Sequence, residues 1–207
     1  MKRIALVVAL FVSMAAPSWA GVDECKAAYD VAFQSADFDF ETALRECKPL
    51  AEQGNAVAQT RLGWMYRAGR SVPEDWVEAE RWYRKAAEQG SAEAQIALGN
   101  MHYRCGREIG SLCASATPVY PDYAEAVKWY RKAAEQGDSW GQIYLGRMYV
   151  AGQGVPQDYV LAHKWANLAT AQKSFVTRER DLVAAKMTPE QIAEAQRLAR
   201  KWKPKKE

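Results

Sequence analysis

The chain has 207 residues, of which 49% are hydrophobic and 26% are charged, and its formal net charge is +3. This length suffices for one domain with a buried core. The small net charge does not indicate a nucleic-acid partner, because such proteins usually carry a strongly basic surface.

The first twenty residues are predicted to be a secretory signal peptide. Lys2 and Arg3 precede an apolar run of 13 residues, and Ser18-Trp19-Ala20 places small residues at the −3 and −1 positions of a cleavage site. The run is too short to span a bilayer. We therefore expect the mature chain, residues 21–207, to reach the periplasm or the cell exterior. No integral membrane segment is expected in it.

Three sequence markers recur with the same spacing. The tripeptide EQG ends at Gly54, Gly90 and Gly137, which are 36 and then 47 residues apart. The pair LG follows the same steps at 62–63, 98–99 and 145–146, and tryptophan recurs at 82, 129 and 165. One period of 36 residues, with 11 extra residues in one repeat, explains all three series.

Each period is predicted to contain two helices. In the first period they span about 55–67 and 75–89, with apolar residues at spacings of three and four. Asp75 with Glu78, and Asp122 with Glu125, have the spacing of capping boxes. Gly90 has the position of a left-handed C-terminal cap, and Ser91 that of the next N-cap.

A glycine in the middle of each first helix predicts close packing. Gly63, Gly99 and Gly146 stand where glycine costs about 1 kcal/mol relative to alanine. Because the same cost is repeated three times, we expect a neighbouring helix to pass too close for a side chain. Stacked helix pairs of this kind bury a continuous core that one pair cannot form alone.

The pattern resembles the Sel1-like repeat, a relative of the tetratricopeptide repeat. The residues that carry the resemblance are LGWMYRAGRSVPEDWVEAERWYRKAAEQG at 62–90 and LGRMYVAGQGVPQDYVLAHKWANLAT at 145–170. The resemblance implies an all-α, right-handed α-solenoid of antiparallel helix pairs with a helical C-terminal cap. It also implies a non-enzymatic adaptor that binds other proteins without a cofactor.

The expected organisation follows from the period. It comprises the signal peptide 1–20, a degenerate N-terminal repeat 21–54, repeats at 55–90, 91–137 and 138–173, and capping helices with a basic tail at 174–207. The second repeat contains the insertion. The basic tail is expected to be solvated, with an acidic partner as the alternative. The chain is expected to be monomeric.

Four cysteines in an exported chain predict two disulfides. Cys25 and Cys47 lie at equal distances from a turn near residue 36, so an antiparallel hairpin would bring them together. The closed loop would contribute about 3 kcal/mol. Cys105 and Cys113 flank part of the insertion and are expected to form the second bridge.

The sequence gives little indication of catalysis or of a metal site. His102 and His163 are isolated in different repeats, and their spacing does not suggest metal ligands. A cysteine-rich branch of the family, linked to β-lactam binding and hydrolysis, shares the seven-residue spacer between Cys105 and Cys113. Its cysteines are placed differently, so that activity cannot be carried over to this chain. An envelope enzyme or binder that acts on β-lactam or peptidoglycan-derived ligands is kept as the alternative function.

Candidate binding residues are those that vary between repeats on the first helices, which line the concave face in tetratricopeptide-like stacks. The set comprises Arg61, Trp64, Ile96, Asn100, Tyr103, Tyr144 and Arg147. Trp64 would suit a binding hot spot, or it packs against the preceding repeat. The inserted loop, 107–120, is a second candidate surface.

Overall fold

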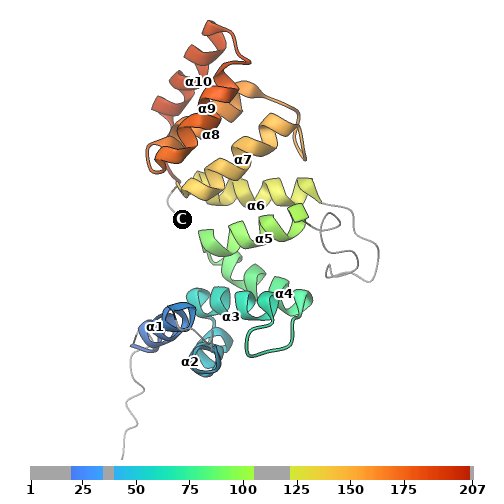
Figure 1. Cartoon of the computed structure of the whole chain (residues 1–207), viewed down its shortest axis with the longest axis vertical. Coiled ribbons are helices and arrows are strands. Elements are labelled where there is room, and N and C mark those ends of the chain that lie inside the picture. The colour runs from blue at the N-terminus through green and yellow to red at the C-terminus, as the bar shows by residue number, and fades with distance from the viewer. Residues whose placement is uncertain (1–19, 35–39, 105–121, 206–207) are drawn as a thin grey trace, which may run out of the picture.

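The computed structural model describes residues 20–34, 40–104 and 122–205, and these residues form helices joined by turns (Figure 1). The helices are α1 (Ala20–Gln34), α2 (Glu41–Glu52), α3 (Ala56–Ala68), α4 (Trp76–Glu88), α5 (Ala92–Arg104), α6 (Tyr123–Glu135), α7 (Ser139–Ala151), α8 (Tyr159–Thr170), the short 3₁₀ helix η1 (Ser174–Val176), α9 (Thr177–Ala184) and α10 (Pro189–Lys201). The predicted all-α class is confirmed.

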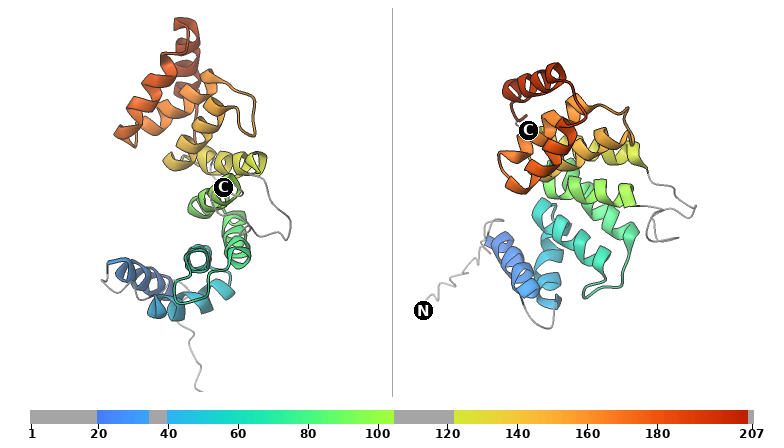
Figure 2. Two further views of the ribbon diagram at one scale, coloured as in Figure 1. Left: turned by 45° about the vertical axis from the view of Figure 1, so that its right-hand side comes forward. Right: turned by 45° about the horizontal axis from the view of Figure 1, so that its top comes forward.

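The helices stack in chain order. The tightest packing is within the pairs α3/α4, α5/α6 and α7/α8, and each pair also packs on the next. The left view of Figure 2 shows the stack as an arc that runs from α1 and α2 at one end to α9 and α10 at the other. The predicted solenoid of antiparallel helix pairs is therefore confirmed.

Local capping explains where the helices begin. Asp75 and Asp122 accept a hydrogen bond from the amide three residues on, in each case at 2.9 Å, as predicted. The predicted return bonds of the capping boxes are replaced by ion pairs, because Glu78 and Glu125 face Arg81 and Lys128 one turn further along the helix. A complete capping box forms at Thr188 and Gln191, at the start of α10.

Glycines with positive φ turn the chain from one repeat into the next. Gly90 has φ +92°, in the left-handed region that favours glycine, as predicted. Ser91 then caps α5 by accepting the Ala94 amide at 3.3 Å.

The core of each repeat is built from aromatic rings and small residues. A side chain at Gly63 or Gly99 would meet the ring of Tyr83 or Tyr130 at 2.9 and 2.4 Å, respectively. The predicted close approach is thus correct in two repeats, where it is made by a ring. At Gly146 it is wrong, since a Cβ there would meet no atom closer than 3.4 Å.

A disulfide closes the N-terminal helix pair. Cys25 and Cys47 are joined, with their Cα atoms 4.8 Å apart, and both residues are fully buried. The predicted pairing is confirmed. The second predicted pair, Cys105 and Cys113, lies outside the described residues, as do residues 1–19 of the expected signal peptide and the inserted loop 107–120.

The C-terminal helices cover the last repeat, and the basic tail docks on the stack. The Trp202 ring packs edge-on against Trp165 at 6.1 Å between centroids. Lys205 donates from its backbone amide to the Glu135 carbonyl at 2.8 Å and forms an ion pair with the Glu135 carboxylate at 2.7 Å. The basic side chains at 197, 200, 201, 203 and 205 are exposed, as expected for a solvated tail, whereas Trp202 is half-buried against the stack.

Candidate functional site

A hollow of about 530 Å³ lies between α5 and α7, and we call it the arginine–tyrosine pocket. It is lined by Arg67, Asn100, Tyr103, Arg104, Tyr130, Tyr144, Arg147, Met148, Ala151 and Gln153. Four of the predicted binding residues are among them: Asn100, Tyr103, Tyr144 and Arg147. The structure thus brings together residues from three consecutive repeats.

Three guanidinium groups dominate the charge of this pocket. Arg67 comes from α3, Arg104 from α5 and Arg147 from α7, and the lining residues that the structure describes include no carboxylate. Arg147 forms a two-bond ion pair with Glu179 of α9, which lies beside the pocket. The Arg67 Nε atom is buried and donates no hydrogen bond to the described residues. The pocket therefore offers positive charge and hydrogen-bond donors to a ligand.

Tyrosine rings give the pocket rigid walls. Tyr130 is almost fully buried, and its hydroxyl donates to Asn100 Oδ1 at 2.9 Å. Burial raises the pKa of Tyr130, so its hydroxyl stays protonated and can act as that donor. Tyr144 stacks on Tyr130 with 5.0 Å between ring centroids. Stacking and this hydrogen bond thus hold the Tyr130 and Tyr144 rings in place on one side of the pocket.

The other three predicted binding residues lie away from this pocket. Arg61 forms an ion pair with Glu93 at 2.6 Å and places its guanidinium over the Tyr29 ring. Ile96, on α5, is half-buried.

Trp64 contributes to an aromatic cluster at the N-terminal end of the stack. Its ring lies 4.6–5.5 Å from those of Tyr29, Phe33 and Phe40 and is half-buried. Of the two alternatives for Trp64, this placement matches packing against the preceding repeat.

The pocket also contains Arg67, Arg104 and Tyr130, which are not among the binding residues predicted from the sequence. The repeat register contained a signal for Arg67, which has the same position in its repeat as Tyr103 and Val150. That position varies as strongly as the positions that were selected. Tyr130 belongs to the motif WYRKAAEQG, which occurs at 82–90 and 129–137, and it also lines the pocket.

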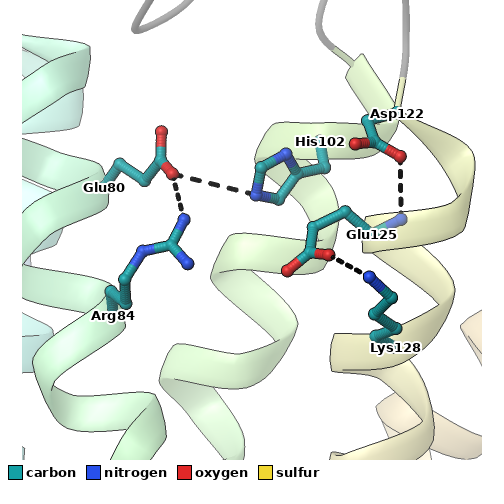
Figure 3. A network of polar contacts seen from close by, with 6 residues as sticks. All are labelled: Glu80, Arg84, His102, Asp122, Glu125 and Lys128. Atoms are coloured by element: carbon teal, nitrogen blue, oxygen red, sulfur yellow. Dashed lines mark hydrogen bonds and ion pairs between the residues drawn. The ribbon is translucent and has the colours of Figure 1, made fainter.

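A second polar cluster spans three consecutive helices (Figure 3). Glu80 of α4 pairs with Arg84 and faces His102 of α5, with 3.9 Å between carboxylate and imidazole. On α6, Glu125 pairs with Lys128 at 2.8 Å, and that hydrogen bond is the main reason its pKa is lowered. Most of these contacts are pairs one helical turn apart, which stabilise exposed helix faces.

The described residues contain no group of three or more histidine, cysteine, aspartate or glutamate side chains placed to hold a metal ion. Among the described helices, none is both long and apolar enough to cross a membrane.

Comparisons with known proteins place the chain in a family. The Sel1 repeat model matches residues 56–91, 92–138 and 141–174, which together cover more than half of the chain. The crystal structure of a Sel1 repeat protein from Oxalobacter formigenes is similar over 80% of this chain and 60% of that chain, with 30% identity and a TM-score of 0.62.

A second crystal structure shares less with this chain. The protein c5321, a protective antigen in uropathogenic Escherichia coli strains that displays an SLR fold, is matched over 88% of this chain and 52% of that one. The identity is 23% and the TM-score 0.38. The chain thus spans about half to three-fifths of the length of these two structures.

No curated protein matches the chain. The three matched repeats and the 30% identical structure are sufficient to establish the family, whose repeats form protein-interaction scaffolds. The chain belongs to the Sel1 repeat family.

Proposed function

We propose that this chain is an exported, non-catalytic adaptor that binds an acidic segment of another protein at the arginine–tyrosine pocket. The observation that carries the proposal is the convergence of Arg67, Arg104 and Arg147, one from each repeat, on a single hollow. Guanidinium groups bind carboxylates through paired, charge-assisted hydrogen bonds. A rigid aromatic wall beside them limits the entropy lost on binding.

The proposal of export rests on two features. The first twenty residues have the pattern of a signal peptide, and the Cys25–Cys47 disulfide is typical of an oxidising compartment. N-terminal sequencing of the protein recovered from the periplasm or the medium tests this part. We expect the mature chain to begin at Gly21, and an intact Met1 terminus on all of the protein would contradict export.

A peptide-display experiment tests the acidic partner. Random peptides are selected on the disulfide-intact chain and on the Arg104→Glu variant. The variant Arg81→Glu serves as the control, because Arg81 is a half-exposed arginine on α4 outside the pocket. We expect enrichment of Asp and Glu with the wild type and with the control, and its loss with Arg104→Glu. Equal enrichment on all three proteins would contradict the site.

The partner is sought by crosslinking in the native cell envelope. A photoreactive residue replaces Tyr103 in the pocket or, as the control, Lys128 on the exposed face of α6. We expect adducts specific to position 103 that disappear in the Arg104→Glu background. Labelling of the purified chain by a fluorescent β-lactam would overturn the non-catalytic part of the proposal.

A further inference from the structure

A second hollow, of about 300 Å³, lies between α7, α8 and α9. Figure 1 shows these three helices in its upper part. The walls of the hollow are mainly apolar, and we call it the ring cavity. It is lined by Ile143 and Gly146 of α7, Ala162 and Ala166 of α8, and Val176 and Val183 from η1 and α9. Arg147, Glu179 and Lys186 also line it.

The cavity exists because the third repeat lacks a tyrosine. Residues 83, 130 and 166 have the same position in successive repeats and are Tyr, Tyr and Ala. In the first two repeats the ring lies directly on the helix glycine, Gly63 or Gly99. The third repeat keeps the glycine, Gly146, but has Ala166 in place of the tyrosine. No ring from this position therefore fills the space next to Gly146.

The second repeat indicates how a ring would be oriented in the ring cavity. There the Tyr130 hydroxyl donates to Asn100, whose counterpart in the third repeat is Arg147. A phenol lying on Gly146 in the same way would direct its hydroxyl towards Arg147 and its partner Glu179. Both side chains line the cavity and could bind that hydroxyl, Glu179 as an acceptor and Arg147 as a donor.

A residue that lines this cavity also carries a buried acceptor without a donor. In the first two repeats the side-chain oxygens of Gln59 and Gln95 accept from a second glutamine at 2.8 and 3.2 Å. The third repeat has the corresponding pair, Gln142 and Gln172, but Gln172 donates to the Gly137 carbonyl instead.

Gln142 is therefore left with an unsatisfied atom. The residue is fully buried and lines the ring cavity, and its Oε1 atom accepts no hydrogen bond from the described residues. A buried acceptor without a partner costs about 1–3 kcal/mol, so this side of the third repeat is less well satisfied than the corresponding sites of the first two.

The size and the surroundings of the cavity fit an aromatic side chain of a protein. An apolar cavity of about 150 Å³ admits benzene, so one of 300 Å³ has room for a substituted ring. Beside it, Leu182 and Phe175 are 60% and 55% exposed, and the Phe175 ring lies 5.6 Å from the exposed Trp140. Neighbouring exposed apolar side chains of this kind are typical of protein-binding surfaces.

We propose that the ring cavity binds a tyrosine side chain presented by a partner protein, in the place that the chain's own tyrosines fill in the first two repeats. This inference rests on the proposed function, since the ring is carried by the bound protein. Arg147 lines both hollows, so one extended segment could place an acidic residue in the arginine–tyrosine pocket and a tyrosine in the ring cavity.

The direct test titrates the full chain with p-cresol, the isolated tyrosine side chain, and follows backbone amides by NMR. We expect saturable shifts centred on Ile143, Gly146, Ala166 and Val183, with a dissociation constant on the order of millimolar. The variant Ala166→Tyr restores the ring of the other repeats and should abolish these shifts. The control Ala171→Tyr makes the same change at an exposed position outside the cavity and should leave them intact.

Two results would overturn the inference. One is the absence of saturable shifts with p-cresol in the wild type. The other is unchanged p-cresol binding by an Ala166→Tyr variant whose thermal unfolding and amide spectrum show that it is folded. Neither result bears on the acidic preference measured with Arg104→Glu, so the two proposals fail independently.

A second experiment distinguishes a tyrosine of a partner protein from a free aromatic molecule as the occupant of the ring cavity. Peptides selected by display should carry a tyrosine at a fixed distance from their acidic residues, and their affinity should fall at least tenfold on Ala166→Tyr. If p-cresol binds but no selected peptide depends on Ala166, the cavity takes a free aromatic molecule, and the assignment to a partner protein is wrong.

Discussion

Gly99 and Gly146 have the same position in two repeats, yet their surroundings differ. A Cβ at Gly99 would lie 2.4 Å from the Tyr130 ring, whereas one at Gly146 would meet the Ala162 carbonyl at 3.4 Å. Tyr130 is buried and hydrogen-bonded to Asn100, so it cannot move away at low cost. The same substitution is therefore expected to have opposite effects at the two positions.

We predict that Gly99→Ala lowers the free energy of unfolding by about 1–3 kcal/mol, as overpacked cores do. Gly146→Ala should raise it by up to about 1 kcal/mol, because alanine is the better helix former and has room there. Urea unfolding of the two variants measures both effects. Equal losses at the two positions would contradict the role assigned to the Tyr130 ring.

His163 is buried on α8, beside Arg180 and Asp181 of α9. Burial, assisted by the nearby Arg180 charge, lowers its pKa, while Asp181 acts in the opposite direction. Its Nδ1 atom lies 2.9 Å from Asn167 Nδ2, and the neutral ring can accept that bond. The folded state therefore favours the neutral imidazole.

The lowered pKa predicts how stability depends on pH. Below about pH 6.5 the unfolded chain binds a proton at this residue more readily than the folded chain. The contribution of His163 is thus fully present above that pH, and it is lost as the pH falls through the folded-state pKa. Urea unfolding between pH 7.5 and 5 should show a decline that His163→Gln reduces. An identical pH dependence in the variant would exclude this residue as a cause.

At the scale of single elements, the N-terminal helix pair depends on its disulfide. The pair α1/α2 lacks the tryptophan and the LG motif of the other repeats, and Cys25 and Cys47 join its two helices. Cross-linking a loop of about this length stabilises the folded state by roughly 3 kcal/mol in the chain-entropy model.

We predict that replacing both cysteines by alanine lowers the stability of α1 and α2 by about 3 kcal/mol. Hydrogen exchange should show faster exchange in these two helices and little change in α7 and α8, which do not contact them. Mild reduction of the wild type should reproduce the effect and leave the double variant unchanged. Uniform loss of protection across the chain would show that the bridge acts globally.

The whole molecule is a stack in which each helix contacts mainly its neighbours in the chain. In such stacks stability is roughly a sum of repeat and interface contributions. A defect in one repeat should therefore weaken its own region first. The exceptions are the ends, where α10 packs on α8 and Lys205 reaches back to Glu135.

Trp82→Ala tests this view of the whole molecule. Trp82 is 6% exposed in the core of the first repeat, and its removal should cost about 3–5 kcal/mol. Exchange should rise most in α2, α3 and α4, because buried residues of α2 and α3 share a core cluster with Trp82, and least in α8 to α10. Trp140→Ala is the control, because Trp140 is 40% exposed and should cost much less. A Trp82 variant as stable as this control would show that the assigned packing is wrong.

Much of this architecture could be predicted from the sequence, because similar residues at the same repeat positions pack in a similar way each time. The steps of 36 and 47 residues predicted the order of the helix pairs. The motif WYRKAAEQG, at 82–90 and 129–137, indicated which face of the second helix is buried in the first two repeats. Caps such as Asp75 and the Cys25–Cys47 pair depend on spacing along the chain, which the sequence contains directly.

The two candidate sites were harder to predict from the sequence, because they depend on distances between residues of different repeats. Comparing repeats identified Asn100, Tyr103, Tyr144 and Arg147, but not their meeting with Arg67 and Arg104 in one hollow. It also gave Trp64 two possible environments, and the packing of α1 and α2 decided between them.

By itself, the sequence determined the family, the period, the helix ends and the absence of a tyrosine at Ala166. Only the tertiary structure decided what that absence means. A missing ring leaves a cavity only if no neighbour moves in to fill the space, and α9 packs on α8 without closing the gap above Gly146. Whether the cavity stays open depends on how α7, α8 and α9 pack against one another. The spacing of residues along the sequence does not predict that packing.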